Sequence, residues 1–223
     1  MSNGNYQETH ERILKSGLAA FLEEGFEKAN LRRICKAAGV TTGAFYKHFK
    51  DKEALFSELV EPLASMIRKA YAQGEKRGFA GYDEGKPVTP EQVRAALEAK
   101  AAGTLATTAM LYSHRDIYEL LVFRSYGTPY EHFLDWLVDE EDRTTLRVLE
   151  LIHGAEKART VISKESLHIV NHAFYSALSE NIIHAKSIEE LTRRPRSFQR
   201  SSMRAGRNIA RFDGSFFFCV KDN

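Results

Sequence analysis

Apolar residues recur at helical spacing along most of the chain. In the first segment they fall three and four positions apart on one face, and they are Ile13, Leu14, Leu18, Phe21 and Leu22. Alternating apolar and polar stretches, which are typical of strands, do not persist, and only five prolines interrupt the 223 residues. The pattern predicts an all-α protein whose first helix ends at Gly25.

Short polar residues that can cap helices mark the next three elements. Such side chains accept a hydrogen bond from the backbone of the first helical turn. Asn30 is predicted to cap a helix that runs to Gly39. Thr41 is predicted to cap the next one, from Thr42 to Phe49, and Asp51 a third, from Lys52 to about Gln73. The glycine-rich stretch 74–89 that follows is predicted to be a loop.

Similar signals predict the helices of the second half. Thr89 is followed by a proline at the first helical position and a glutamine three residues after the cap. Thr128 and Ser187 begin comparable patterns. Long apolar segments predict buried helices at Ser113–Ser125, Tyr130–His153 and about Lys164–Ala185. Eight helices are expected before residue 186.

Two of the short predicted helices meet at the tripeptide 38–40. Gly39 suits the left-handed conformation of a sharp helix exit, and Val40 can fill the space between the helices. A turn of this length with a glycine is typical of a helix-turn-helix. Phe45 and Phe49 stand four residues apart and are expected to face inward together.

The remaining residues of the second short helix suit the major groove of DNA. They are Thr41, Thr42, Gly43, Ala44, Tyr46, Lys47 and His48. Small residues allow a close approach, and the polar ones have the reach needed for base edges and phosphates. Lys52 is a further candidate, because a cation in the first turn of a helix opposes the helix dipole unless an anion binds there. We therefore expect Lys52 to bind a phosphate.

The charge distribution agrees with an anionic partner near this segment. The net charge of the chain is only +2, but Lys28–Lys52 holds seven basic residues against Asp51 alone. A compact basic stretch indicates binding to an anion such as DNA. A solvated surface is the alternative, and charge by itself does not decide between them.

The stretch resembles the N-terminal domain of the TetR family of transcriptional regulators over about residues 7–60. The resemblance rests on Ile34, Ala38, Gly39, Val40, Thr41, Gly43, Tyr46, His48, Phe49, Lys52 and Leu55. Cys35 stands where the family usually has alanine, which favours a packed core thiol over a redox sensor. The resemblance implies a three-helix helix-turn-helix DNA-binding domain at residues 1–52 and a helical effector-binding and dimerisation domain at 53–191.

The resemblance also implies the partners. A member of the family is expected to bind a double-stranded DNA operator as a homodimer in the cytoplasm and to act as a repressor that a small-molecule effector releases. Aromatic residues are expected to line the effector pocket, and the candidates are Tyr112, Phe123, Tyr126, Phe133, Trp136 and Phe174. Family members generally end in long, regular helices, and residues 192–223 depart from this because they lack a clean helical period. Residues 192–212 also contain seven arginines and no acid. We expect an irregular basic tail there.

Other classes of function find less support. The two cysteines lie far apart, the N-terminus is polar, and no apolar run is long enough to span a membrane. We find no nucleophile–base pair, and neither the His168/His172 pair nor the acids 139–142 complete a metal set by spacing. We therefore expect no enzyme activity, no cofactor and no metal. The alternative is a helical interaction protein whose helix-turn-helix no longer binds DNA.

Overall fold

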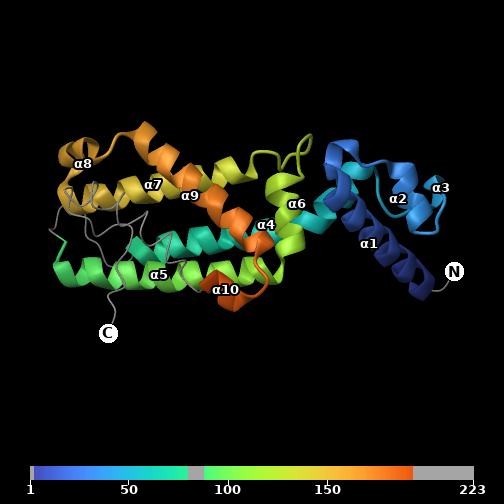
Figure 1. The fold of residues 1–223 in the computed structure, drawn as a ribbon, viewed down its shortest axis with the longest axis horizontal. Coiled ribbons are helices and arrows are strands. Elements are labelled where there is room, and N and C mark those ends of the chain that lie inside the picture. Colours follow the sequence, from blue (N-terminus) through green and yellow to red (C-terminus); the bar gives the residue numbers. More distant parts are fainter. Residues whose placement is uncertain (1–2, 80–87, 193–223) are drawn as a thin grey trace. The chain divides into compact units, whose positions relative to one another are not determined.

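The computed structural model describes residues 3–79 and 88–192 (Figure 1). Every regular element in these ranges is a helix, which confirms the predicted all-α class. The helices are α1 (Asn3–Lys28), α2 (Leu31–Ala37), α3 (Thr42–Phe45), α4 (Lys52–Phe79), α5 (Pro90–Ser113), α6 (Arg115–Phe123), α7 (Phe133–His153), α8 (Ala155–Val161), α9 (Lys164–His184) and α10 (Ile188–Thr192). None of the helices described is long and apolar enough to cross a membrane. Apart from Thr192, the predicted basic tail lies outside the described residues.

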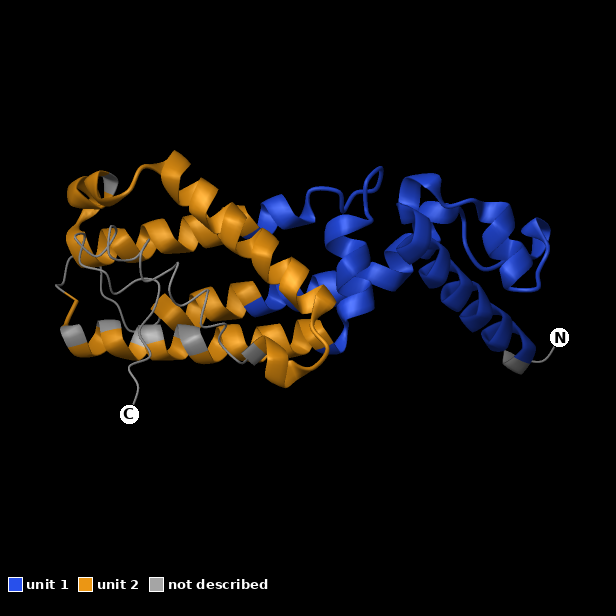
Figure 2. Cartoon of the chain, in the orientation of Figure 1, with its two compact units in different colours: residues 1–70, 113–137 blue, residues 71–112, 138–223 orange. Residues whose placement is uncertain are grey.

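The chain divides into two compact units (Figure 2). The first comprises residues 1–70 and 113–137, and the second comprises residues 71–112 and 138–223. The boundary expected after residue 52 divides a predicted DNA-binding part from a predicted effector-binding part. The division into two compact units instead follows how the helices pack. The first unit extends beyond residue 52 because α6 packs against α1 within it.

A break in α1 organises the core of the first unit. Gly25 has a φ of 76°, so the helix is interrupted there, as predicted. After the break, Phe26 donates its backbone N–H to the carbonyl of Arg124 at 2.9 Å. The rings of Phe21 and Phe26 each pack edge-on against Phe56 at a centroid distance of 5.2 Å. This cluster joins α1 to α4 and thereby fixes the scaffold that carries α2 and α3.

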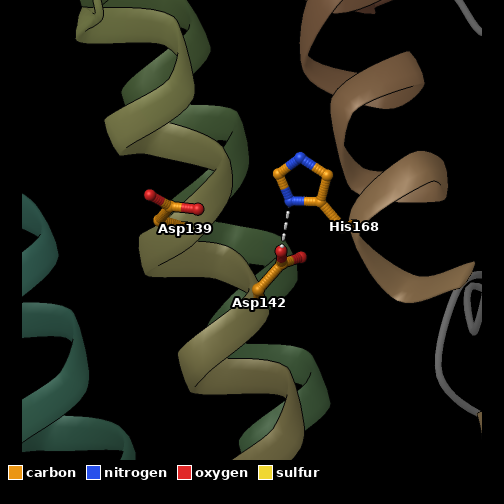
Figure 3. A group of neighbouring side chains, drawn as sticks. All are labelled: Asp139, Asp142 and His168. Carbon is orange, nitrogen blue, oxygen red and sulfur yellow. Dashed lines mark hydrogen bonds and ion pairs between the residues drawn. The ribbon is translucent and has the colours of Figure 1, made fainter. Parts of the chain in front are cut away.

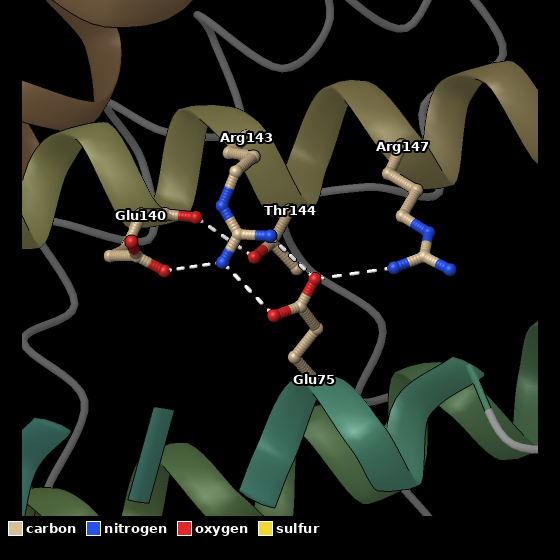
Figure 4. A network of polar contacts seen from close by, with 5 residues as sticks. All are labelled: Glu75, Glu140, Arg143, Thr144 and Arg147. Atoms are coloured by element: carbon tan, nitrogen blue, oxygen red, sulfur yellow. Dashed lines mark hydrogen bonds and ion pairs between the residues drawn. The ribbon is translucent and has the colours of Figure 1, made fainter. Parts of the chain in front are cut away.

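Polar contacts join the helices of the second unit. Glu75 on α4 accepts hydrogen bonds from two arginines of α7, Arg143 at 2.5 Å and Arg147 at 3.2 Å (Figure 4). Nearby, the hydroxyls of Tyr71 and Tyr175 lie 2.5 Å apart, and Tyr175 donates to Glu141 at 3.1 Å. Burial is the main reason that the pKa of Tyr175 is raised far above its ordinary value. These contacts connect α4, α7 and α9 within this unit.

Two of the predicted capping boxes are present. The hydroxyl of Thr89 accepts from the backbone N–H of Gln92 at 3.3 Å, and the side chain of Gln92 accepts from the N–H of Thr89 at 2.9 Å. Ser187 accepts from the N–H of Glu190 at 3.2 Å. Both motifs depend on residues three apart in sequence, so the sequence alone is sufficient to predict them.

The expected start of a helix at Thr128 is wrong. The hydroxyl of Thr128 donates to the carbonyl of Ser125 at 2.6 Å and accepts from the N–H of Tyr130 at 3.1 Å. The threonine therefore closes a buried turn, and α7 begins only at Phe133. The threonine hydroxyl thus serves a local turn in place of a helix cap, and residue type alone does not distinguish these two uses.

Two further differences concern helix number and length. α4 continues past Gln73 to Phe79, because the ion pairs of Glu75 hold its last turns against α7. α8, which follows Gly154 at a φ of 80°, has no counterpart among the predicted helices. Nine helices rather than eight therefore precede residue 186 in the described ranges.

Candidate nucleic-acid interface

The helix-turn-helix of the first unit has the predicted caps. Asn30 caps α2 by accepting from the N–H of Arg32 at 2.9 Å, and Thr41 caps α3 by accepting from the N–H of Ala44 at 3.1 Å. Between the two helices Gly39 adopts a φ of 68°, a conformation that a side chain would strain. These local signals set the angle at which α3 leaves α2.

Two phenylalanines hold the second helix in place. Phe45 and Phe49 are buried, and their rings stack at 5.5 Å. α3 itself ends at Phe45, but the N–H groups of His48 and Phe49 still bond to the Phe45 carbonyl at 2.8 and 3.0 Å. We call residues 41–49 the recognition segment. Its inward face is apolar and fixed, as predicted.

Most of the residues predicted to contact DNA are exposed on the outward face of the recognition segment. Thr41, Thr42, Gly43, Tyr46 and Lys47 are exposed, whereas Ala44 and His48 are half-buried. Tyr46 is 58% exposed although it is a large aromatic residue. Such a surface offers hydroxyls, one amine and an aromatic ring on a short, well-supported element.

An aromatic stack covers His48, which is a feature that the sequence analysis missed. The ring of Tyr6 stacks on His48 at 4.1 Å, and the Tyr6 hydroxyl donates to the carbonyl of Lys47 at 3.3 Å. His10, which is bonded to Glu58 at 2.6 Å, stacks on Phe49 at 4.6 Å. Burial, with smaller contributions from His10 and Lys47, lowers the pKa of His48. The spacing of Tyr6 and His10, four residues apart, is the signal that could have indicated a shared face.

The expected role of Lys52 is corrected by its contacts. Its ammonium group donates to the carbonyls of Phe26 at 2.6 Å, Glu27 at 3.2 Å and Ala29 at 3.1 Å. An ammonium group has three donors, so none is left for a phosphate. The negative end of α1 therefore explains a cation at the start of α4 without any bound anion. Lys52 holds α1 and α4 together beside the recognition segment.

A surface hollow of about 680 Å³ lies beside α3 in the same unit. It extends over the connection between α1 and α2 and onto the recognition segment. Its lining residues are Glu27, Lys28, Ala29, Asn30, Leu31, Arg32, Thr42, Tyr46 and Lys52. Arg32 adds an exposed cation that the sequence analysis did not single out.

The six aromatic residues expected to line an effector pocket are not equivalent. Phe123 and Tyr126 are 40% and 68% exposed, so they are not part of an enclosed pocket, and we correct their assignment. Phe133 and Trp136 pack together at 5.3 Å in the first unit. Tyr112 and Phe174 are half-buried in the second unit. Tyr126 lies between α6 and α7, so helical spacing gives no information on which way it faces.

Cys35 is a packed core residue, as the sequence favours. It is 2% exposed, and burial raises the pKa of its thiol. A thiol that is neutral and inaccessible is a poor redox sensor.

Comparison with known proteins identifies the domain. Residues 13–59 match the family model described as bacterial regulatory proteins, tetR family. Over 61 residues the chain is 53% identical to the HTH-type transcriptional regulator AcrR of Shigella flexneri, and the alignment covers 27% of this chain and 28% of that protein. Residues 13–59 are therefore similar to the N-terminal domain of TetR-family transcriptional regulators.

Further relatives match a similarly short part of the chain. The uncharacterized HTH-type transcriptional regulator YdgC of Bacillus subtilis is 40% identical over 62 residues, which cover 28% of this chain and 32% of that protein. The chain thus matches less than a third of the length of these two curated relatives. Among solved structures, that of NalD, the secondary repressor of the MexAB-OprM multidrug efflux pump in Pseudomonas aeruginosa, aligns with a TM-score of 0.47 and 19% identity, and the alignment covers 85% of this chain and 94% of that one.

Proposed function

We propose that this chain is a sequence-specific DNA-binding transcriptional regulator of the cytoplasm. The observation that carries the proposal is the two-sided recognition segment. Phe45 and Phe49 anchor its inner face, while its outer face leaves Thr42, Tyr46 and Lys47 exposed. A protein without a nucleic-acid partner has no need to keep a bulky tyrosine and a lysine on a short element held this firmly.

The contacts with DNA divide by chemistry. Thr41, Thr42, Gly43 and Ala44 lie at the end of the segment that can enter the major groove, where small residues permit close approach to base edges. Lys47, Tyr46 and Arg32 have the reach and the charge or hydroxyl needed for phosphates. His48 lies at the end of the segment, where Tyr6 stacks on its ring and burial lowers its pKa. Lys52 stabilises the scaffold of α1 and α4 beside which the segment lies.

Dimer formation and effector release are the finer parts of the proposal. Operators are read by paired recognition elements, so a homodimer is expected to bind a nearly palindromic site. An exposed apolar residue on α9, Ile169 at 67%, offers surface for a second copy. By resemblance to its family, the chain is a repressor whose affinity for DNA falls when a small molecule binds the helices after α4. Linkage requires such an effector to bind the DNA-bound form more weakly.

Binding to DNA from upstream of the chain's own gene tests the proposal. Fluorescence anisotropy of a labelled duplex is measured at two salt concentrations, with a random duplex of equal length as competitor. We expect saturable binding that weakens with salt and that the random duplex competes for poorly. Equal competition by both duplexes, or no binding at low salt, would instead favour the helical interaction protein.

A further inference from the structure

Three metal-ligating side chains that are distant in sequence meet in the second unit. Asp139 and Asp142 stand three residues apart on α7, and His168 faces them from α9 (Figure 3). One donor atom from each residue lies within 4.8 Å of the others. The spacing in the sequence showed an acidic run and a histidine pair but did not bring the two together.

Only part of the acidic run 139–142 turns toward His168. Glu140 accepts from Arg143 at 2.5 Å, and Glu141 accepts from Tyr175 at 3.1 Å, so both have other partners. Asp139 has neither a hydrogen bond nor an ion pair within the described part of the chain. Asp142 is bonded to His168 Nδ1 at 2.8 Å. Two carboxylates therefore lie beside one imidazole, so negative charge is in excess at this place.

A buried amide orients the central ligand. Asn171 is 1% exposed and donates its side-chain N–H to Asp142 Oδ1 at 2.7 Å. The other oxygen, Oδ2, is thereby held toward His168. Ligands of protein metal sites are usually fixed by such outer hydrogen bonds, because they reduce the entropy lost on binding.

The donor set selects a class of ion. One imidazole nitrogen and two carboxylate oxygens suit divalent first-row transition ions such as Zn²⁺, whereas Mg²⁺ and Ca²⁺ prefer oxygen alone. Ligand bonds of about 2.1 Å place tetrahedral donors about 3.4 Å apart. The three donor atoms, which lie within 4.8 Å of one another, are thus already near the spacing that an ion requires. We propose that Asp139, Asp142 and His168 bind one divalent transition-metal ion that links α7 to α9, with water in the open positions.

Calorimetric titration of the full chain with Zn²⁺ tests the site without DNA, so its result is independent of the proposed function. We expect one ion per chain, and at least about tenfold weaker binding in both His168→Ala and Asp142→Asn. His184→Ala is the matched control, since His184 lies on the same helix and pairs with the single exposed carboxylate of Glu180 at 3.2 Å. This variant is expected to bind like the parent, and Mg²⁺ is expected not to compete.

Spectra of protein labelled with ¹⁵N-histidine identify the ligand directly. Addition of Zn²⁺ is expected to shift the ring nitrogens of His168 and to leave those of His184 unchanged. Absence of saturable binding, or equal affinity in the parent and His168→Ala, would show that the three residues form a salt bridge only. Circular dichroism of each variant establishes that it is folded, which is expected because the His168 side chain is 47% exposed.

Discussion

The ammonium nitrogen of Lys52 lies 2.6 Å from the carbonyl oxygen of Phe26 and 4.3 Å from the centroid of the same residue's ring. One side chain at the start of α4 thus closes the end of α1 and covers the aromatic cluster beneath it. The break at Gly25 makes this possible, because it turns the last carbonyls of α1 toward α4. The recognition segment is therefore supported by a contact that lies outside the surface proposed to bind DNA.

Replacement of Lys52 by methionine is expected to destabilise the first unit. Methionine keeps an apolar stem but leaves the carbonyls of Phe26, Glu27 and Ala29 without their donor, so the free energy of unfolding should fall by about 2 kcal/mol. Urea denaturation measures this change. Lys50→Met, at an exposed neighbouring lysine, is the control and should be nearly neutral. If Lys52→Met left the stability unchanged and made the salt dependence of DNA binding flatter, the result would support a contact between Lys52 and phosphate.

The two glycines around the turn are expected to respond differently to alanine. Gly39→Ala should lower the free energy of unfolding by about 1–2 kcal/mol, because its φ of 68° is strained for any side chain. Gly43→Ala should leave stability unchanged or slightly raised, since a methyl group there meets no atom closer than 3.9 Å. Gly43→Ala should nevertheless weaken DNA binding if the segment approaches the groove closely. Equal destabilisation by both substitutions would refute this distinction.

Lys47 is expected to contribute to DNA binding without contributing to the fold. Lys47→Ala should weaken binding about tenfold, equivalent to about 1.4 kcal/mol, and leave the melting temperature unchanged. Lys69→Ala makes the same change of charge at an exposed position of α4 outside the recognition segment, and we expect less than a twofold effect. Anisotropy titrations with a specific duplex measure both. Similar losses in the two variants would mean that net charge alone determines binding.

The ion pairs of Glu75 predict how stability changes in acid. Hydrogen bonding to Arg143 is the main reason that the pKa of Glu75 is held below its ordinary value of 4.5. Since the folded-state pKa is the lower one, the stabilisation is fully present above pH 4.5 and is lost as the pH falls through the folded value. Urea titrations from pH 7 to 3 should show a shallower decline for Glu75→Gln, which is already less stable at pH 7. Glu156→Gln, at an exposed residue of α8, should decline like the parent.

Features that depend on neighbours in sequence were predictable, and those that depend on distant contacts were not. Asn30, Thr41 and Gly39 act within one turn of their own positions, so their roles follow from residue type and spacing. Lys52 is recognisable as unusual from the sequence, but its carbonyl partners lie more than twenty residues away.

The second unit shows the same limit. Nothing in the sequence pairs Asp142 with His168, because the contact depends on how α7 and α9 pack. In the first unit, the exposure of Tyr126 likewise results from the turn that precedes α7 and not from helical spacing.

Selection of duplexes from a random pool by the full chain tests the central claim most directly. If the recognition segment reads DNA as proposed, the pool should converge on two copies of a short half-site in inverted orientation. Their centres should lie about 10 base pairs apart, or a multiple of that distance. The variant Thr42→Ala/Lys47→Ala should fold and should fail to enrich the same sequences. A folded parent protein that enriches no sequence over the starting pool would contradict the account.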